Sequence, residues 1–393
     1  SANERTAVVA GLCSHGLAVF RALALRGIPT IALESNRSLP GYFTKSARVV
    51  TIPEVNAEGL VDSLRELGQN QTGQAKPVLF LTNDNMVRIV GENWAVLSDF
   101  YELSWSNSRH IIVQLLDKSF CERFLRDRNY PLPGTWVFAN QEAAVRIPDA
   151  IRFPVIAKPS HPLGQFKANR VDDKQGLVAL VAAHPGTSMV IQEWIPGGDE
   201  DIFFCATVAK NGKPLCFFDG VKYLSHPPAR GQTVVAGPAD LRDLRKLLIR
   251  FVADANLDGP VSIEAKRDPR GEMRIIEPTV GRTDFWAKLA ITNGIDLPYY
   301  EYLSVTSPQL DIVEHRPRIQ KIWFDSEKDP ASFIRLFGRI CRKKGKFWLP
   351  SFCYLDLKDW QPFWKSMAQL LGRTRRYLER RLGISRVINT SNK

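Results

Sequence analysis

The N-terminal part of the chain alternates between short apolar runs and a helical pattern, and this alternation limits the possible fold more than any other feature. A stretch with apolar residues at helical spacing, residues 17–26, separates the first two of three runs of strand length, at residues 6–11, 27–33 and 77–81. Strands that alternate with helices are typical of a parallel sheet covered by helices. We therefore expect an α/β fold at the N-terminus.

The turn after the first predicted strand contains glycine but lacks the spacing of a dinucleotide-binding loop. Gly11 and Gly16 are its only glycines, so the pattern G-x-G-x-x-G is absent. A polar segment, residues 82–85, follows the third strand at the edge where open α/β sheets bind ligands. Asp84 in this segment could face a ligand or cap the next helix, and the sequence leaves both interpretations open.

The pattern changes at about residue 106, which indicates a second part of the chain. Helical patterns at residues 118–129 and 239–255 accompany strand-like runs at residues 153–158, 188–193, 201–208 and 214–218. After about Leu310 no alternating pattern persists, and the chain becomes aromatic and basic. We expect three domains, at residues 1–105, 106–310 and 311–393, the second with a small lobe at about 115–195 and a large lobe at about 196–310.

Residues 261–279 form the most informative segment, because they predict a β-hairpin that carries two acidic side chains. A two-residue turn at Arg270 and Gly271 places Glu264 directly opposite Glu277. Opposed carboxylates repel unless a positive charge lies between them, and nucleotide-bound Mg²⁺ ions would supply that charge. A solvent-facing carboxylate pair is the alternative interpretation.

Two lysines lie at positions suited to an anionic ligand. Lys158 ends an apolar strand and precedes a turn-rich loop, where an ammonium group can hold nucleotide phosphates. Lys118 begins a helix, where its charge opposes the helix dipole. Residues 190–201 add a strand that ends in Glu193 and Trp194 and continues into acidic residues. This segment could bind adenine and ribose, but a plain strand, turn and acidic loop explains it as well.

Composition limits the class of protein and its surroundings. The six cysteines form no C-x-x-C pair and have no evident activating partner, so we expect small buried side chains rather than a zinc site or disulfides. The chain has no apolar stretch of about 18 residues and no signal-peptide pattern, so we expect a cytoplasmic location. The formal net charge is +12, yet no known nucleic-acid-binding motif accompanies it, and we expect no nucleic-acid partner.

Part of the positive charge lies near the C-terminus, in residues 339–346 and 373–381. Before the second of these runs, apolar residues recur at helical spacing: Trp360, Phe363, Trp364, Met367, Leu370 and Leu371. This pattern suits an interfacial helix on the inner face of an anionic membrane, or a helix packed on the rest of the protein.

Taken in order, these segments resemble the ATP-grasp superfamily, and within it carboxylate–amine ligases of the D-aspartate ligase type. The resemblance covers roughly residues 6–305 and depends on the order of its motifs: Asp117-Lys118, residues 153–159, residues 192–197, Glu264, and Glu277 with Thr279. It implies an N-terminal Rossmann-like domain, a two-lobed α+β ATP-grasp domain and a basic C-terminal extension. It also implies a ligase that joins a small-molecule carboxylate to an amine through an acyl phosphate, with ATP and with Mg²⁺ or Mn²⁺.

The same resemblance implies a role for each matching residue. For the nucleotide it implies Lys118 and Lys158 at the phosphates, Gln192, Glu193, Trp194 and Ile195 at the adenine, and Asp199, or the nearby Glu200 or Asp201, at the ribose. For the metal and the substrates it implies Glu264, Glu277 and Thr279 as metal ligands, Lys222 and Arg230 at the γ-phosphate or acyl group, and Arg282 at the acyl-phosphate oxyanion.

The last motif departs from the family pattern. The family usually has Glu-x-Asn-x-Arg, whereas this chain has Thr279 in place of the asparagine and Arg282 one position later than the usual arginine. A threonine hydroxyl is a poorer metal ligand than an amide carbonyl. An ATP-binding regulator or scaffold without ligase turnover is therefore the alternative function.

Overall fold

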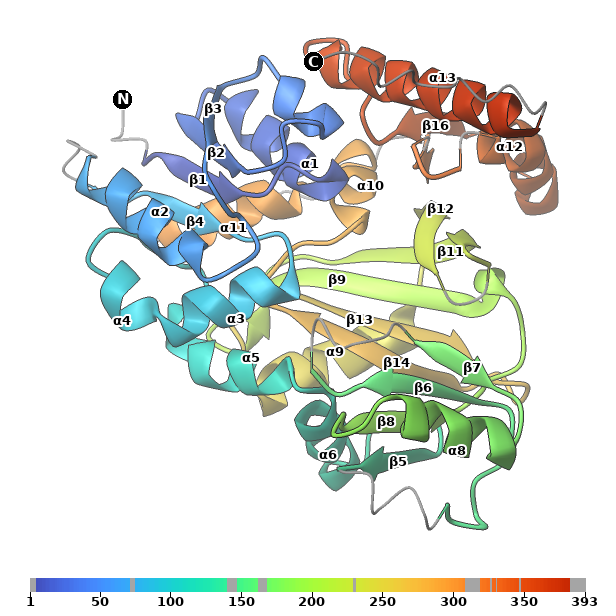
Figure 1. Ribbon diagram of the computed structural model, residues 1–393. Coiled ribbons are helices and arrows are strands. Elements are labelled where there is room, and N and C mark those ends of the chain that lie inside the picture. Colours follow the sequence, from blue (N-terminus) through green and yellow to red (C-terminus); the bar gives the residue numbers. More distant parts are fainter. Residues whose placement is uncertain are drawn as a thin grey trace, which may run out of the picture.

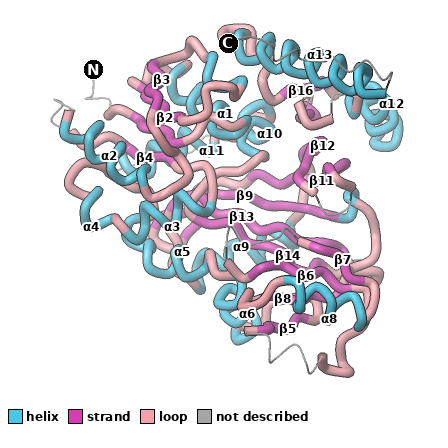
Figure 2. The backbone as a smooth tube through the Cα atoms, in the orientation of Figure 1, coloured by secondary structure: helices cyan, strands magenta, loops and turns pink. Residues whose placement is uncertain are grey.

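The computed structural model describes residues 5–70, 75–139, 147–161, 168–228, 231–307, 319–325, 327–329, 331–345 and 348–381. Within these residues the chain is a mixed α/β structure with three β-sheets (Figure 1). The large sheet occupies the centre, and two four-stranded sheets lie on either side of it (Figure 2).

The N-terminal sheet is parallel, as the alternating pattern predicts, and has the strand order β3-β2-β1-β4. Its strands are β1 (Ala7–Ala10), β2 (Thr30–Glu34), β3 (Arg48–Thr51) and β4 (Val78–Phe80). The accompanying helices are α1 (Ser14–Ala24), η1 (Pro40–Phe43), α2 (Gly59–Gln69), α3 (Asp84–Glu92) and α4 (Trp94–Leu97). Because helices cover both faces, β1 is apolar and buried along its whole length.

The small sheet is antiparallel and has the order β5-β8-β6-β7. Its strands are β5 (Thr135–Phe138), β6 (Val155–Pro159), β7 (Asn169–Val171) and β8 (Met189–Glu193). The helices η2 (Ser106–Ser108), α5 (Arg109–Leu115) and α6 (Lys118–Asp127) lead into it, and α8 (Lys174–Ala183) covers one face. Val155 and Ala157 of β6 join the apolar core on that face, which turns Lys158 to the other side.

The large sheet has the order β14-β13-β9-β11-β12-β15-β16, with β10 paired to β9. Its strands up to residue 280 are β9 (Ile202–Lys210), β10 (Lys213–Pro214), β11 (Phe218–His226), β12 (Gln232–Pro238), β13 (Gly259–Arg267) and β14 (Met273–Val280). The turn η3 (Asp199–Asp201) precedes β9, and the helices of this part are α9 (Arg242–Asp254), α10 (Trp286–Thr292) and α11 (Leu297–Thr306).

Strands β13 and β14 form the predicted hairpin, but its turn is longer than two residues. The last pair before the turn is Arg267 with Met273, and Gly271 within the turn has a positive φ of 86°. An irregularity of register after Glu264 offsets the longer turn, so Glu264 still pairs with Glu277. The predicted two-residue turn is therefore wrong, whereas the opposition of the two glutamates is confirmed.

Two strands lie beyond Leu310, where the sequence shows no alternating pattern. Strand β15 (Lys321–Phe324) pairs with β12 and, in parallel, with β16 (Leu349–Phe352), so both extend the large sheet. These strands are only four residues long, too short for an alternating pattern to be visible. Helix α12 (Ser332–Lys344) packs Ile340 against this end of the sheet.

The apolar helical pattern near the C-terminus corresponds to α13 (Gln361–Arg381), which contacts η1 and lies at the upper right of Figure 1, above β16. Among the described helices, none is both long enough and apolar enough to cross a membrane. The last twelve residues, 382–393, lie outside the described part of the chain.

Candidate active site

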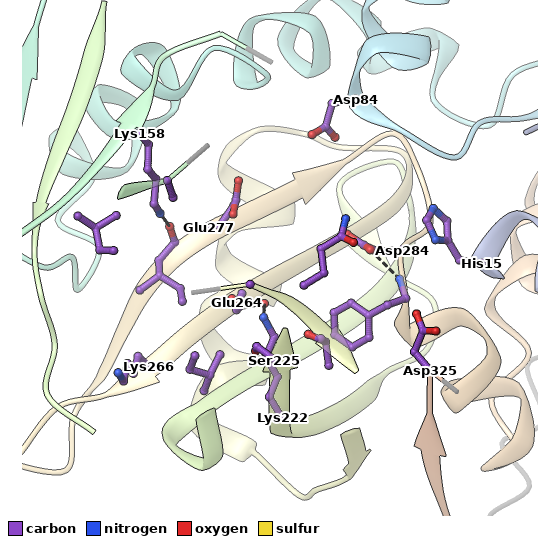
Figure 3. Close-up of a pocket in the computed structure, with 18 of the residues that line it drawn as sticks. His15, Asp84, Lys158, Lys222, Ser225, Glu264, Lys266, Glu277, Asp284 and Asp325 are labelled. Carbon is purple, nitrogen blue, oxygen red and sulfur yellow. Dashed lines mark hydrogen bonds and ion pairs between the residues drawn. The ribbon is translucent and has the colours of Figure 1, made fainter. Parts of the chain in front are cut away.

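A cavity of about 480 Å³ is lined by residues from all three sheets (Figure 3). Segments that follow β1 and β4 line it on the side of the N-terminal sheet, β6 and β8 on the side of the small sheet, and β11, β13, β14 and β15 on the side of the large sheet. Its ionisable lining residues are His15, Asp84, Lys158, Glu193, Lys222, Glu264, Lys266, Glu277, Arg282, Asp284, Asp325 and Lys328. Most of the residues predicted from the sequence therefore meet in one place.

Glu264 and Glu277 lie opposite each other on β13 and β14, and a lysine from a different element faces each of them. Lys222 Nζ of β11 lies 2.5 Å from Glu264 Oε2. Lys118 Nζ donates a hydrogen bond to Glu277 Oε1. Burial alone would raise the pKa of Glu277, but Lys118 and Lys158 lower it to about 2. Glu277 therefore carries a negative charge at neutral pH.

The start of α6 holds Lys118 in a smaller adjoining cavity, which Lys158 and Glu277 also line. Asp117 caps this helix, because its Oδ1 accepts the Phe120 N–H at 2.7 Å. The Lys118 N–H donates to the Ser160 carbonyl oxygen at 2.8 Å, which joins the helix start to the end of β6. These bonds fix Lys118 near the strand that carries Lys158.

Lys158 extends from β6 toward the hairpin of the large sheet. Its Nζ donates to the Ile276 carbonyl oxygen at 3.2 Å. Burial lowers the pKa of Lys158 below its ordinary value, and the nearby Glu277 offsets this effect only in part. An anionic ligand in the cavity would stabilise this partly buried cation.

The two glutamates fit a metal site that a ligand completes. Among the described residues, no group of three or more His, Cys, Asp or Glu side chains could hold a metal by itself. Mg²⁺, however, is commonly bound by one or two carboxylates while phosphates and water supply the other oxygens. Lys222 and Lys118 now neutralise these carboxylates, which shows that the position attracts positive charge.

The segment after β8 borders the cavity as the sequence predicts. Gln192, Glu193, Trp194 and Ile195 all line it. Lys266 Nζ lies 4.8 Å from the centre of the Trp194 ring, within cation–π distance. The sequence analysis missed Lys266, although it lies two residues beyond Glu264 on β13 and alternation of side chains would have pointed to it.

Asp199 and Asp201 are not among the residues that line the cavity. Asp199 Oδ2 accepts the Ser225 N–H at 2.8 Å, and Asp201 Oδ2 accepts the Gly198 N–H at 3.0 Å. Both carboxylates are therefore used to fix the loop between β8 and β9. The sequence could not distinguish this use from a ribose contact, because both place acids after a turn.

Arg282 lies between two carboxylates at the side of the N-terminal sheet. Its Nε donates to Asp84 Oδ1, and its Nη1 lies 2.9 Å from Asp284 Oδ2. Burial would lower the pKa of Arg282, but Asp284 and Asp84 raise it well above its ordinary value. Asp84 is therefore not the cap of α3: Asn83 is, since its Oδ1 accepts the Met86 N–H at 2.9 Å.

His15 lines the same end of the cavity, and the sequence analysis missed it. Its Nε2 lies 2.7 Å from the Thr82 carbonyl oxygen and 3.3 Å from Cys13 Sγ. Burial would lower the pKa of His15, but Cys13 and Asp284 raise it to about 9. Burial would raise the pKa of Cys13, but His15 lowers it. The prediction that no cysteine has an activating partner is therefore wrong for Cys13.

The remaining residues fall into three groups. Thr279 lines a smaller cavity of about 60 Å³, which Lys118 and Glu277 also border. Trp323, Asp325 and Lys328 of the C-terminal region line the main cavity, and no pattern in the sequence indicated them. Arg230 lies outside the described residues.

No protein-family model and no curated protein matches the sequence. Similarity is found among solved structures. The N5-carboxyaminoimidazole synthase of Aspergillus clavatus, in complex with ADP and 5-aminoimidazole ribonucleotide, has a TM-score of 0.63 at 13% identity, over 81% of this chain and 80% of that one.

Two further enzymes show the same similarity of fold. The biotin carboxylase domain of Hydrogenobacter thermophilus 2-oxoglutarate carboxylase, solved with MgADP, ADP and bicarbonate, has a TM-score of 0.60 at 16% identity and covers 80% of this chain and 71% of that chain. The L-amino acid ligase of Bacillus licheniformis has a TM-score of 0.58 at 17% identity, and the match covers 78% of this chain and 75% of that chain. The chain therefore has the ATP-grasp fold, as the resemblance in its sequence predicts.

Proposed function

We propose that this protein is an ATP-dependent ligase that forms an amide bond between a carboxylate and an amine through an acyl phosphate. The observation that carries this proposal is the position of Glu264 and Glu277. They face each other in one cavity, with three lysines from three other elements around them. The solved structures of similar fold include a ligase of L-amino acids and two enzymes bound to ADP.

The nucleotide would extend from the small sheet toward the hairpin. Residues 192–195 would border the adenine, and Lys118 and Lys158 would neutralise the phosphates. Mg²⁺ bound to Glu264 and Glu277 would reduce the negative charge on the γ-phosphate. Nucleotide binding would require Lys222 and Lys118 to leave their present carboxylate partners. Both lysines would then bind phosphate oxygens, which carry more negative charge.

The reaction then needs two displacements and no protein nucleophile. An oxygen of the substrate carboxylate forms a bond to the γ-phosphorus, and the bond from that phosphorus to the bridging oxygen breaks, so that ADP leaves. The amine nitrogen next forms a bond to the acyl carbon, and the carbon–oxygen bond to phosphate breaks. Inorganic phosphate leaves with one oxygen of the original carboxylate.

The second substrate would bind at the end of the cavity formed by His15, Asp84, Arg282 and Asp284. Arg282 is held by two carboxylates at a fixed place, so its guanidinium can face an acyl-phosphate oxyanion without reorganisation. Asp84 and Asp284 would attract an ammonium group, and Asp84 would accept the proton that the amine must lose before it attacks. Arg282 lowers the pKa of Asp284, which makes that carboxylate the weaker base.

A screen of paired carboxylates and amines, with release of inorganic phosphate as the signal, tests the proposal. Phosphate should appear only when ATP, a carboxylate and an amine are all present. For a pair that reacts, a carboxylate labelled with ¹⁸O should transfer one label to the phosphate. Phosphate without the label would contradict the acyl phosphate, and absence of turnover with every pair would contradict the ligase.

Thr279 favours a second candidate, an ATP-binding regulator or scaffold. A hydroxyl in place of the family's amide weakens the second metal position beside Glu277. In this case calorimetry would detect MgATP binding to the protein, while no substrate pair would give phosphate. The two candidates thus differ in turnover and not in nucleotide binding.

A further inference from the structure

We propose that an exposed apolar stripe, formed by α13 and the segment directly before it, binds the surface of an anionic lipid bilayer. The stripe consists of Leu357, Trp360, Trp364 and Leu371, whose exposed fractions are 93%, 52%, 56% and 70%. Large apolar side chains that gather at the surface in this way mark an interaction site, whereas single ones do not. This inference is independent of the proposed ligase activity.

The geometry of the helix separates the stripe from the side that packs on the protein. Trp364 and Leu371 are seven residues apart, so they lie on one side of α13. Trp360 directly precedes the helix, and the centre of its ring lies 6.2 Å from that of Trp364. Phe363 packs against the apolar core and Ser366 is buried. The apolar helical pattern of the sequence therefore contains two faces, of which only one is used inside the protein.

The stripe is held in place by strong contacts directly before α13. The Asp359 carboxylate is buried and accepts hydrogen bonds from the Arg21 side chain and, at 2.8 Å, from the Lys45 N–H. Near the middle of the helix, Arg373 Nη2 donates to the Glu327 carbonyl oxygen at 3.0 Å. A surface fixed in this way loses little conformational entropy when it binds.

The charge around the stripe indicates which partner it fits. Helix α13 has six Lys and Arg residues and a single acidic residue, Glu379. One of them, Lys365, has its Nζ 4.4 Å from the ring centre of Phe43 of η1, which is itself partly exposed. Tryptophan with lysine and arginine is the composition of helices that lie in the interface of anionic membranes.

Charge also argues against the obvious alternative, a second copy of the same chain. A symmetric dimer through the stripe would place the basic residues of both copies close together, where they would repel each other. Anionic headgroups would instead neutralise them while the tryptophan rings enter the acyl boundary. A polyanion alone would satisfy the charge but would leave the apolar stripe in water.

Flotation of the full-length protein with vesicles tests the proposal. We expect binding to vesicles that contain phosphatidylcholine and phosphatidylglycerol, and little binding to phosphatidylcholine alone. The variant Trp360→Ser/Trp364→Ser should reduce binding at least about tenfold, because the apolar contact is lost. Brominated lipids should quench part of the tryptophan fluorescence of the wild type and less of that of the variant.

A matched control uses an exposed apolar residue on a different helix. Ile334 of α12 is 84% exposed, and Ile334→Ser should leave vesicle binding unchanged. Thermal unfolding should be the same for all three proteins, since none of these side chains is buried. Equal flotation with neutral and anionic vesicles, or no flotation at all, would overturn the proposal. A dimer in gel filtration that the double substitution dissociates would show that the stripe binds a second copy instead.

Discussion

Arg21 Nε lies 2.8 Å from Asp359 Oδ2, and both side chains are buried although 338 positions separate them in the chain. The pair joins α1 of the N-terminal sheet to the segment before α13. Thr44 Oγ1 and the Lys45 N–H also donate to the Asp359 carboxylate. The charge of Asp359 is thus satisfied entirely by N-terminal residues.

We expect Asp359→Ala to lower the free energy of unfolding by about 3–5 kcal/mol, because it leaves the Arg21 charge buried without a partner. Urea denaturation of the purified protein measures this change. Glu379→Ala is the control: it breaks an exposed pair with Arg375 and should cost about 0.5 kcal/mol or less. Similar losses for the two variants would contradict the importance of the buried pair.

Glu277→Gln should abolish ATP turnover while the protein remains folded. The substitution keeps the size of the side chain but removes the negative charge that the metal and Lys118 require. Turnover of a substrate pair found by the screen is the measurement. Glu272→Gln changes an exposed glutamate in the turn of the same hairpin and should keep wild-type activity. An active Glu277→Gln enzyme would remove the basis of the proposed metal site.

Thr279→Asn introduces the asparagine that ATP-grasp enzymes usually have at this position. An amide oxygen beside Glu277 is a better ligand for Mg²⁺ than a hydroxyl, so we expect turnover to reach half of its maximum at a lower Mg²⁺ concentration. A titration of activity against Mg²⁺ checks this. Thr279→Val, which removes the oxygen at nearly the same size, should shift the curve the other way.

Glu301 gives the protein a predictable dependence of stability on pH. Burial raises its pKa from 4.5 to about 8, and only the hydrogen bond from Ser104 opposes this. Between these two values the folded protein keeps a proton that the unfolded chain has lost, so stability falls as pH rises from about 4.5 to about 8. Glu301→Gln cannot ionise, and we expect a flatter profile of melting temperature between pH 5 and pH 8. An unchanged profile would show that Glu301 is not the group responsible.

The parts of the site that lie on one strand or one hairpin could be predicted from the sequence. Glu264 and Glu277 are opposed because they belong to adjacent strands, and Lys158 was found because an apolar strand ends at it. The two glutamates pair as predicted because two differences from the predicted hairpin compensate each other: the turn is longer, and the register shifts after Glu264. Local rules therefore placed the pair correctly without giving the correct path of the backbone.

The parts that depend on contacts between distant segments could not be predicted. His15 follows a strand of the N-terminal sheet, whereas Asp284 and Asp325 follow strands of the large sheet. These residues meet in the cavity only because the two sheets come together. Asp199 shows the opposite error: its acidic loop suggested a ligand contact, but a backbone N–H from a neighbouring strand uses its carboxylate. The spacing of residues in the sequence does not indicate which partner a polar group contacts in the folded protein.

The pairing of β15 with β12 has a consequence for any shortened form of the protein. Val235 and Ala236 of β12 are paired with Phe324 and Trp323, which belong to the last part of the chain. A fragment that stops near residue 310 would retain nearly every side chain proposed to hold the nucleotide, yet it would expose β12 as an open strand with free N–H and C=O groups. Such an edge recruits strands from other molecules. The C-terminal region thus protects the large sheet from aggregation.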